Sequence, residues 1–363
     1  MNIKEFQNPK LIAKLVEKIN EYKKPISLME VCGSHTMAIG KWGIRNLLPK
    51  NIKLISGPGC PVCVTPMSII DALLDLKNVT IAIFGDLMRV PGENGSLELA
   101  KAKGLDVKIV YSPMDALKLA EKKETVFVGI GFETTIPGIA HTIQKAYENK
   151  IKNFSVLTSL KTVPPALKLL SSDKDINLDG FILPGHVSVI IGKDAYNFLP
   201  SDYNIGGVVT GFEPADILVS VEKLIRQKEN NEPKIENEYS RIVTNRGNIH
   251  AQNLMNKVLK TSDGIFRGIG EIPNSELKIR EKYSEFDAEK KYNIKIEYKE
   301  DKSGCRCGDV LKGIIVPPEC PLFGNKCTPS NPIGPCMVSS EGSCSAYFKY
   351  ERNSSRQVAK SLS

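Results

Sequence analysis

Eight short apolar runs limit the fold of this chain more than any other feature. Each run is rich in β-branched residues and leads through Gly, Pro or Ser into a helical stretch. They occupy residues 26–31, 52–57, 79–85, 107–112, 125–131, 154–159, 180–185 and 207–212. Alternating strands and helices predict an α/β protein with mainly parallel sheets covered by helices on both faces.

Eight strand–helix units are enough to close one barrel, but a motif that occurs twice favours two open sheets of four strands each. Gly-Phe-Glu directly follows an apolar strand twice, at residues 131–133 and 211–213. We therefore predict two similar domains, the first over residues 1–123 and the second over residues 124–230. An amphipathic helix is predicted ahead of the first strand, at residues 9–24.

The last third of the chain has a different character. From about residue 227 the sequence is charged and irregular, which predicts a linker, and a helix is predicted at residues 248–260. Residues 304–350 are crowded with Cys, Gly and Pro and have little periodicity. Something other than an apolar core must hold this part together, so we predict a C-terminal metal-containing domain over residues 231–363.

Composition excludes several classes of protein. No apolar run approaches the roughly 18 to 20 residues that a bilayer requires, and the N-terminus is unlike a signal peptide, so we expect a cytoplasmic protein. The net charge of +8 is spread among acidic residues and forms no basic stripe, which argues against nucleic-acid binding. Nine cysteines in a reducing compartment indicate metal or redox chemistry rather than structural disulfides.

The unusual segments follow the strands, and in open α/β sheets ligands collect beyond the carboxyl ends of strands. Cys32 and His35 lie in "CGSHT" after the first strand. A thiol at the start of a helix has a lowered pKa, and the histidine could stabilise the thiolate, bind a metal or shuttle a proton. The alternative is a loop thiol beside a histidine that is hydrogen-bonded to backbone.

Cys60 and Cys63 form a C-P-V-C motif after the second strand. This spacing suits a reversible disulfide or half of a zinc site. Because no second C-x-x-C or His pair follows at the usual distance, we favour the dithiol. Polar residues after other strands are further candidates for ligand or partner binding: Asp86, Arg89, Glu93, Glu133, His186 and Glu213.

Six cysteines crowd the C-terminal block: Cys305, Cys307, Cys320, Cys327, Cys336 and Cys344. Four thiolates hold a cubane iron–sulfur cluster, which leaves two cysteines over. Zinc ribbons show paired C-x2-C hooks, whereas these gaps are long and uneven, so we favour a cluster over zinc. The spacing alone leaves the choice of ligands open and permits Cys320, Cys327, Cys336 and Cys344.

The motifs "MEVCGSHT", "GPGCPVC", "GFETT", "PGHVS" and "ECPLFGNKC…CMVSSEGSC" together resemble the HypD family of nickel–iron hydrogenase maturation proteins, from about residue 25 to 350. The resemblance implies a scaffold on which iron receives one carbon monoxide and two cyanide ligands. It implies as partners the chaperone HypC and the cyanide donors HypE and HypF. It also implies two similar α/β domains and a domain with a 4Fe–4S cluster; with transient partners we expect a monomer.

The resemblance also assigns roles to the cysteines. Cys32 would bind the iron of the Fe(CN)2CO unit together with the N-terminal cysteine of HypC, with His35 as a neighbouring proton group. Cys60 and Cys63 would pass electrons between the cluster and this iron. The family pattern C-x14-C-x6-C-x16-C falls on Cys305, Cys320, Cys327 and Cys344 as cluster ligands and leaves Cys307 and Cys336 as a redox pair.

These roles describe a maturation scaffold with redox activity rather than a conventional metabolic enzyme. One alternative is a free-standing iron–sulfur thiol–disulfide oxidoreductase resembling ferredoxin:thioredoxin reductase, for which iron at Cys32 is incidental. Another is a zinc-stabilised interaction module, which would be colourless and have no reducible disulfide.

Overall fold

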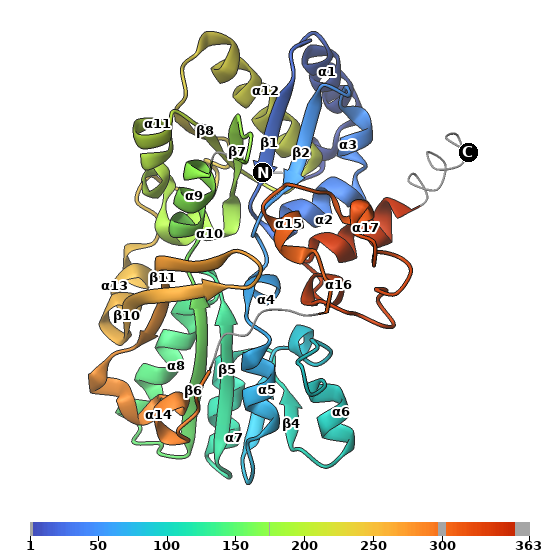
Figure 1. The fold of residues 1–363 in the computed structure, drawn as a ribbon. Helices are drawn as coiled ribbons and strands as arrows, with labels where there is room; N and C mark the ends of the chain where they lie inside the picture. Colours follow the sequence, from blue (N-terminus) through green and yellow to red (C-terminus); the bar gives the residue numbers. More distant parts are fainter. Residues whose placement is uncertain (1–2, 174, 297–302, 353–363) are drawn as a thin grey trace.

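The computed structural model describes residues 3–173, 175–296 and 303–352. Its strands form two sheets, one in the upper and one in the lower half of Figure 1. All eight predicted runs form strands, and the predicted α/β class with two mainly parallel sheets is confirmed.

Sheet A consists of five parallel strands. Their order across the sheet is β2 (Ile52–Ser56), β1 (Ile26–Glu30), β7 (Gly180–Pro184), β8 (Gly206–Thr210) and β9 (Ile235–Asn237). The two strands β7 and β8 are buried along their whole length, as expected for apolar runs covered on both faces.

Sheet B consists of six strands. Their order is β10 (Leu259–Phe266), β11 (Gly270–Ile279), β6 (Phe154–Lys161), β5 (Thr125–Gly131), β3 (Thr80–Ile83) and β4 (Val107–Ile109). Strands β6, β5, β3 and β4 are parallel, while β10 and β11 form an antiparallel hairpin that adds to β6.

The prediction that each sheet contains four consecutive strands is wrong. The first two strands pair with β7, β8 and β9, and the four strands between them, β3 to β6, form sheet B with β10 and β11. The predicted boundaries at residues 123 and 230 therefore do not divide one sheet from the other, because both sheets have strands on either side of each boundary. Apolar parallel strands resemble one another along the sequence, so their partners are decided by packing between distant segments.

Helices cover both sheets and connect their strands. The α-helices are α1 (Pro9–Asn20), α2 (Gly33–Lys41), α3 (Ile44–Leu47), α4 (Pro61–Val64), α5 (Ser68–Leu74), α6 (Leu97–Ala102), α7 (Pro113–Ala120), α8 (Ile136–Glu148), α9 (Val163–Ser172), α10 (Gly185–Ile191), α11 (Phe198–Tyr203), α12 (Pro214–Asn230), α13 (Ile249–Val258), α14 (Ala288–Lys291), α15 (Cys307–Leu311), α16 (Pro335–Val338) and α17 (Ser343–Tyr350). The 3-10 helices are η1 (Ile3–Gln7), η2 (Gly85–Leu87), η3 (Lys193–Tyr196), η4 (Glu281–Phe286) and η5 (Pro317–Glu319).

Local signals explain several of these helices. The predicted N-terminal helix forms as α1, where the Asn8 side chain accepts a hydrogen bond from the Lys10 N–H at 2.9 Å and Pro9 takes the first helical position. A capping box of Ser112 and Asp115 starts α7. The predicted linker after residue 227 instead contains the end of α12 and strand β9.

Three apolar cores hold the molecule together. One lies between sheet A and helices α1, α2 and α12, and a second between sheet B and helices α7, α8 and α13. The third and largest joins the remaining faces of both sheets to α4, α5 and α9, and it includes Cys63, Cys307 and Cys336. The predicted redox cysteines are therefore buried in the core between the two sheets.

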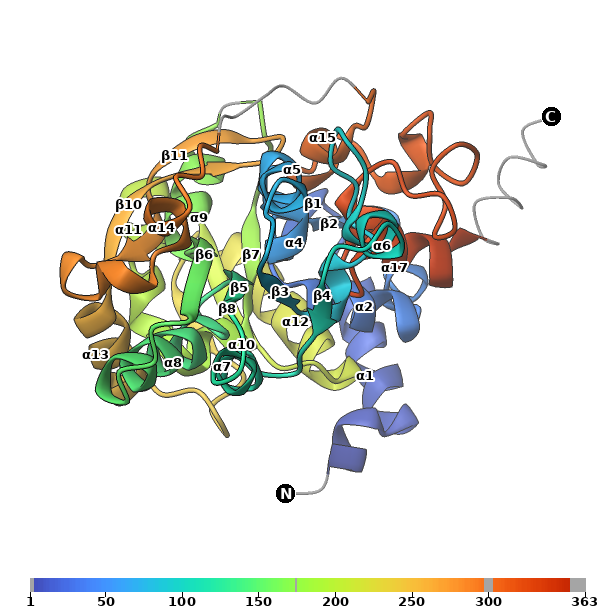
Figure 2. The same ribbon diagram turned by 90° about the horizontal axis from the view of Figure 1, so that it is seen from below.

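The Cys-rich C-terminal region lies against both halves of the molecule. Its last helix, α17, packs on α2, and Arg45 of α3 stacks on Tyr347 and pairs with Glu351 at 2.5 Å. On its other side the tip of the β10–β11 hairpin reaches this region, as Figure 2 shows from below. Within the described ranges no helix is long and apolar enough to cross a membrane.

Candidate functional site

Cys32 lies where β1 gives way to α2 and forms the N-cap of that helix in extended conformation. Its carbonyl accepts hydrogen bonds from the His35 N–H at 2.8 Å and the Thr36 N–H at 3.1 Å. The N–H groups of Ser34 and His35 lower the pKa of the thiol, as predicted for a helix start. Burial outweighs them, however, and raises the pKa of Cys32 to about 12, so the prediction of a lowered thiol pKa is wrong and the free thiol is neutral.

Two neighbouring segments close over Cys32. The loop before Cys60 passes so near that a Cβ on Gly59 would lie 2.3 Å from the Cys32 nitrogen. From the C-terminal region, Glu341 accepts a hydrogen bond from the Ser34 hydroxyl at 2.9 Å and leaves no room for a Cβ on Gly33. Glycine is therefore required at both positions by close backbone approach.

Glu30 is a buried acid beside Cys32 that the sequence analysis missed. It is 0% exposed, accepts a hydrogen bond from the Thr36 hydroxyl at 2.5 Å, and accepts a second from the Cys32 N–H at 3.2 Å. Burial raises the pKa of Glu30 to about 7. The available signal was an acid at the end of the otherwise apolar run "ISLME".

His35 is fully buried and bonded to backbone. Its Nε2 lies 2.9 Å from the Gly211 carbonyl and 3.2 Å from that of Thr210, so Nε2 carries the hydrogen that is donated. Burial lowers the pKa of His35 to about 4, which keeps the ring neutral. Its Nδ1 has no hydrogen-bond partner among the described residues, and the ring stacks on Phe212 at 4.7 Å. This is the backbone-bonded arrangement weighed above.

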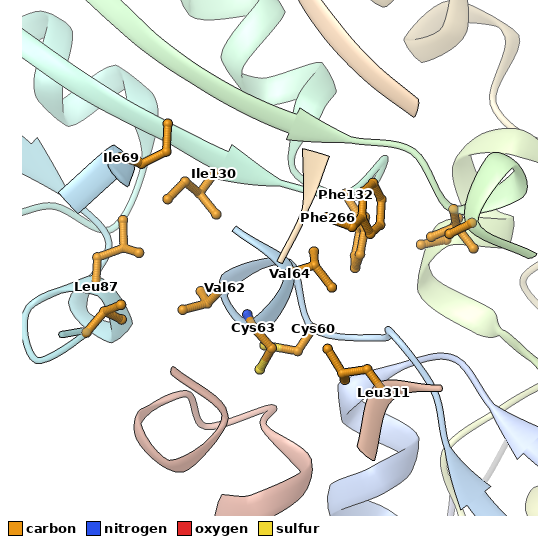
Figure 3. Close-up of a cluster of buried hydrophobic side chains, with 14 of the residues drawn as sticks. Cys60, Val62, Cys63, Val64, Ile69, Leu87, Ile130, Phe132, Phe266 and Leu311 are labelled. Carbon is orange, nitrogen blue, oxygen red and sulfur yellow. The ribbon is translucent and has the colours of Figure 1, made fainter. Parts of the chain in front are cut away.

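Cys63 lies on α4 and Cys60 is its N-cap, and α4 lies between the two sheets (Figure 1). Cys60 caps the helix, and its sulfur accepts the Cys63 N–H at 3.2 Å. The Cys60 thiol donates to the Ser339 hydroxyl at 3.3 Å. Figure 3 shows Val64, on the same short helix, beside Phe132 and Phe266 of the central core. The dithiol is thus held rigidly and almost without contact to solvent.

Four thiols form a continuous series through the core. Burial and the neighbouring thiols of Cys336 and Cys60 raise the pKa of Cys63, and the Cys336 thiol and burial raise that of Cys307. The neighbouring thiols of Cys307 and Cys63 hold the pKa of Cys336 well below its ordinary value. Each sulfur therefore neighbours the next, which is the arrangement that thiol–disulfide exchange requires.

Arg267 brings a buried positive charge to this series and was also missed. It lies at the tip of the β10–β11 hairpin and is 3% exposed, and its backbone N–H donates to the Val64 carbonyl at 2.7 Å. Burial raises the pKa of Cys305 to about 11, and Cys336 and burial raise that of Cys307; the Arg267 guanidinium opposes both rises and adds to the lowering of the pKa of Cys336. No local pattern in the sequence distinguishes it from a surface arginine.

A small pocket collects most of the C-terminal cysteines. Its lining includes Cys305, Cys307, Cys320, Cys327 and Cys344, together with the apolar residues Val310, Leu322, Phe323 and Met337. Burial raises the pKa of Cys344, and the charges of Cys336, Cys305, Cys327 and Cys320 add to this rise. Cys336 is not part of this lining and also interacts with Cys307 and Cys63.

The pocket has the donors that a cubane cluster needs, namely thiols in an apolar, water-poor setting. Among residues 3–173, 175–296 and 303–352, no three His, Cys, Asp or Glu side chains converge on a point where one metal ion would bind.

The other predicted polar residues have mixed surroundings. Glu133 is buried and accepts a hydrogen bond from the Val163 N–H at 2.9 Å, while Glu213 caps α12. Arg89 donates to the Pro329 carbonyl at 2.8 Å. His186 is exposed and stacks on the same Phe212 ring as His35. Asp86 accepts hydrogen bonds from the C-terminal region, which are considered below.

Comparison with known proteins gives a consistent result along the whole chain. The family model "HypD: Hydrogenase formation hypA family" matches residues 9–351. The chain is 44% identical to the hydrogenase maturation factor HypD of Escherichia coli, with 97% of this chain and 99% of that protein covered. It is 42% identical to a putative hydrogenase expression/formation protein of Methanocaldococcus jannaschii, with 94% and 98% covered.

Proposed function

Because the chain belongs to the HypD family of hydrogenase maturation factors, we propose that it is the scaffold on which the Fe(CN)2CO unit of the nickel–iron hydrogenase is assembled. The observation that carries the proposal is the position of Cys32. Its buried thiol lies against the loop of Cys60, and from Cys60 the series of neighbouring thiols leads to the pocket of C-terminal cysteines.

Cys32 binds the iron of this cargo as thiolate. A soft thiolate suits an electron-rich iron with carbon monoxide and cyanide ligands. Burial opposes the free thiolate, and the positive charge of iron compensates for that cost, so the site favours the metal-bound form over the empty ionised form. The neutral His35 on the same helix, with Nε2–H donated to the Gly211 carbonyl, leaves Nδ1 able to accept a hydrogen bond.

The thiol series carries two electrons by disulfide exchange. The Cys336 thiolate attacks Cys63 of a Cys60–Cys63 disulfide, which forms a Cys63–Cys336 bond and releases the Cys60 thiolate. The Cys307 thiolate then attacks Cys336, forms a Cys307–Cys336 disulfide and releases the Cys63 thiolate. The Cys60–Cys63 pair is reduced and the Cys307–Cys336 pair oxidised, so two electrons move and no other reactant is consumed.

Cys305, Cys320, Cys327 and Cys344 would hold a 4Fe–4S cluster in the pocket described above. This choice is supported by the lining of the pocket, which includes all four and not Cys336, and by the interaction of Cys307 with Cys336. When bound, the cluster supplies single electrons to the neighbouring disulfide. The apolar residues around the pocket exclude water from these thiolates.

The cargo is handed on with partners. We propose that a HypC-type chaperone shares the iron through its own N-terminal cysteine and that HypE and HypF provide the cyanide. We place this work in the cytoplasm, where the thiols remain reduced. The second candidate function, a free-standing thiol–disulfide oxidoreductase, is favoured by the same thiol series but gives Cys32 no role.

Infrared spectroscopy of the anaerobically purified complex with HypC separates the two. Native protein should show cyanide and carbonyl stretching bands, and Cys32→Ala should lose them while the absorption of the cluster remains. Ser34→Ala is the matched control, because it removes a contact of the same helix to Glu341 and keeps the thiol. Native complex without these bands, but with a cluster spectrum, would overturn the scaffold proposal in favour of the oxidoreductase.

A further inference from the structure

Asp86 is a candidate from the sequence analysis that the proposed function does not use. It lies in η2, directly after β3 of sheet B, and is partly exposed. One of its carboxylate oxygens accepts three hydrogen bonds: from the Ser339 hydroxyl at 3.2 Å, the Ser340 N–H at 3.1 Å and the Ser340 hydroxyl at 2.9 Å. This carboxylate is therefore fixed on the end of α16.

Ser339 connects this carboxylate to a redox thiol. Its oxygen accepts the Cys60 thiol at 3.3 Å and the Glu341 N–H at 3.2 Å, and Ser339 is 1% exposed. A hydroxyl has two lone pairs and one hydrogen, so these two donors occupy both lone pairs. The single hydrogen then points to Asp86, and the direction of all three bonds is set by the structure.

The contacts thus form a directed line from a buried thiol to the surface. The hydrogen of Cys60 points to Ser339, the hydrogen of Ser339 points to Asp86, and Asp86 borders solvent. A negatively charged carboxylate at the end of such a line attracts the proton of the thiol. Without this line, a proton leaving the 3% exposed Cys60 would have no polar route to water among these contacts.

One short helix supplies both partners of the thiol pair. Helix α16 carries Cys336 near its start, and Ser339 is its C-cap. Cys336 contacts Cys63, while Ser339 contacts Cys60. The sulfur that exchanges and the hydroxyl that handles the proton are therefore positioned together, and they act on adjacent sulfurs of the same C-P-V-C motif.

We propose that Ser339 and Asp86 form a proton relay for Cys60, an inference that rests on the thiol exchange proposed above. When Cys60 leaves a disulfide as thiolate, Ser339 gives it a proton and recovers one from water by way of Asp86. When Cys60 attacks, the proton travels the opposite way and the electron pair of its sulfur forms the new bond. Ser339 touches the reacting sulfur, and Asp86 is the positioning residue behind it.

The relay is tested by the rate at which Cys60 is alkylated by iodoacetamide in the reduced full-length protein, measured by mass spectrometry of its peptide. Ser339→Ala and Asp86→Asn should slow alkylation at least about tenfold, within the range of general base catalysis. Ser339→Thr should restore the native rate. Ser340→Ala is the matched control, because it removes a contact to Asp86 without touching Cys60, and its rate should stay close to native.

Two results would overturn the relay. One is a native rate in Asp86→Asn; the other is equal rates in Ser339→Ala and Ser339→Thr, a comparison that is sufficient if Asp86→Asn does not fold. Loss of the serine hydroxyl opens space beside Cys60, so a structural effect alone would speed alkylation rather than slow it.

A separate measurement distinguishes failure of the relay from failure of the proposed function. In a Cys60→Ser/Cys307→Ser double variant the Cys63–Cys336 disulfide has no resolving thiol on either side and should accumulate on mild oxidation. If this disulfide accumulates while Cys60 of Asp86→Asn is alkylated at the native rate, the proposed thiol–disulfide exchange stands and the proposed proton relay is wrong. If it does not form while Asp86→Asn is slow, exchange is wrong and the relay to Cys60 stands.

Discussion

Replacing Glu133 with Gln should stabilise the protein above neutral pH. Glu133 follows β5, is 2% exposed, and its Oε2 has no hydrogen-bond partner in the described part of the chain. The N–H groups of Glu133 and Val163 favour the carboxylate, but burial outweighs them and raises the pKa from 4.5 to about 7. Glutamine keeps the shape and the acceptor for Val163 and removes the ionisable group.

The sign follows from proton binding. Between about pH 4.5 and pH 7 the folded protein keeps a proton that the unfolded chain has released, so the stability of the native protein falls as pH rises through this window. The full loss is about 3 kcal/mol above pH 7. The stability of Glu133→Gln relative to the native protein should therefore rise by about 2 kcal/mol between roughly pH 5.5 and pH 8.

Urea unfolding followed by circular dichroism at these two pH values measures the difference under anaerobic conditions. The comparison at the lower pH serves as the internal control for any effect of the amide on packing. An advantage of Glu133→Gln that is the same at both pH values would refute the assignment of a raised pKa to Glu133. So would a variant that is less stable than native protein only at the higher pH.

Two further sets of substitutions test the packing of the core. Gly33→Ala would place a Cβ 2.3 Å from the Glu341 Cβ and should destabilise the folded protein by more than about 1 kcal/mol in urea unfolding, whereas Gly138→Ala, with open space around it, should stabilise α8 by roughly 0.5–1 kcal/mol. Glu276→Leu leaves the buried Lys161 without its carboxylate and should cost about 3–5 kcal/mol, most of which Lys161→Met in the same chain should restore. A Gly33→Ala variant with the native free energy of unfolding would contradict this account of the packing. So would a Glu276→Leu/Lys161→Met variant that is as unstable as Glu276→Leu alone.

Local sequence patterns were sufficient for the individual elements. Apolar runs of β-branched residues become strands wherever both faces are covered, and Asn8 with Pro9 is enough to begin α1. The same patterns could not assign strands to sheets. Strands β1 and β7 pair across about 150 residues of intervening chain, and nothing in either run identifies the other as its partner.

The candidate site divides in the same way. The motifs placed Cys32, Cys60 and Cys63 after strands because loops at the carboxyl ends of parallel strands carry such residues. The sequence could not show that burial raises the pKa of Cys32 by more than the helix start lowers it. This burial depends on Gly59 and the C-terminal segment, which close over the thiol.

Only the tertiary structure brought Asp86, Ser339 and Cys60 into one line. These residues follow a strand of sheet B, a helix of the C-terminal region and a strand of sheet A, and each is ordinary in its own segment. Hydrogen bonds and thiol contacts act over about 3–4 Å, whereas sequence patterns report only on neighbours along the chain. The sequence therefore indicated the chemistry of single residues, whereas packing decided which of them lie in contact.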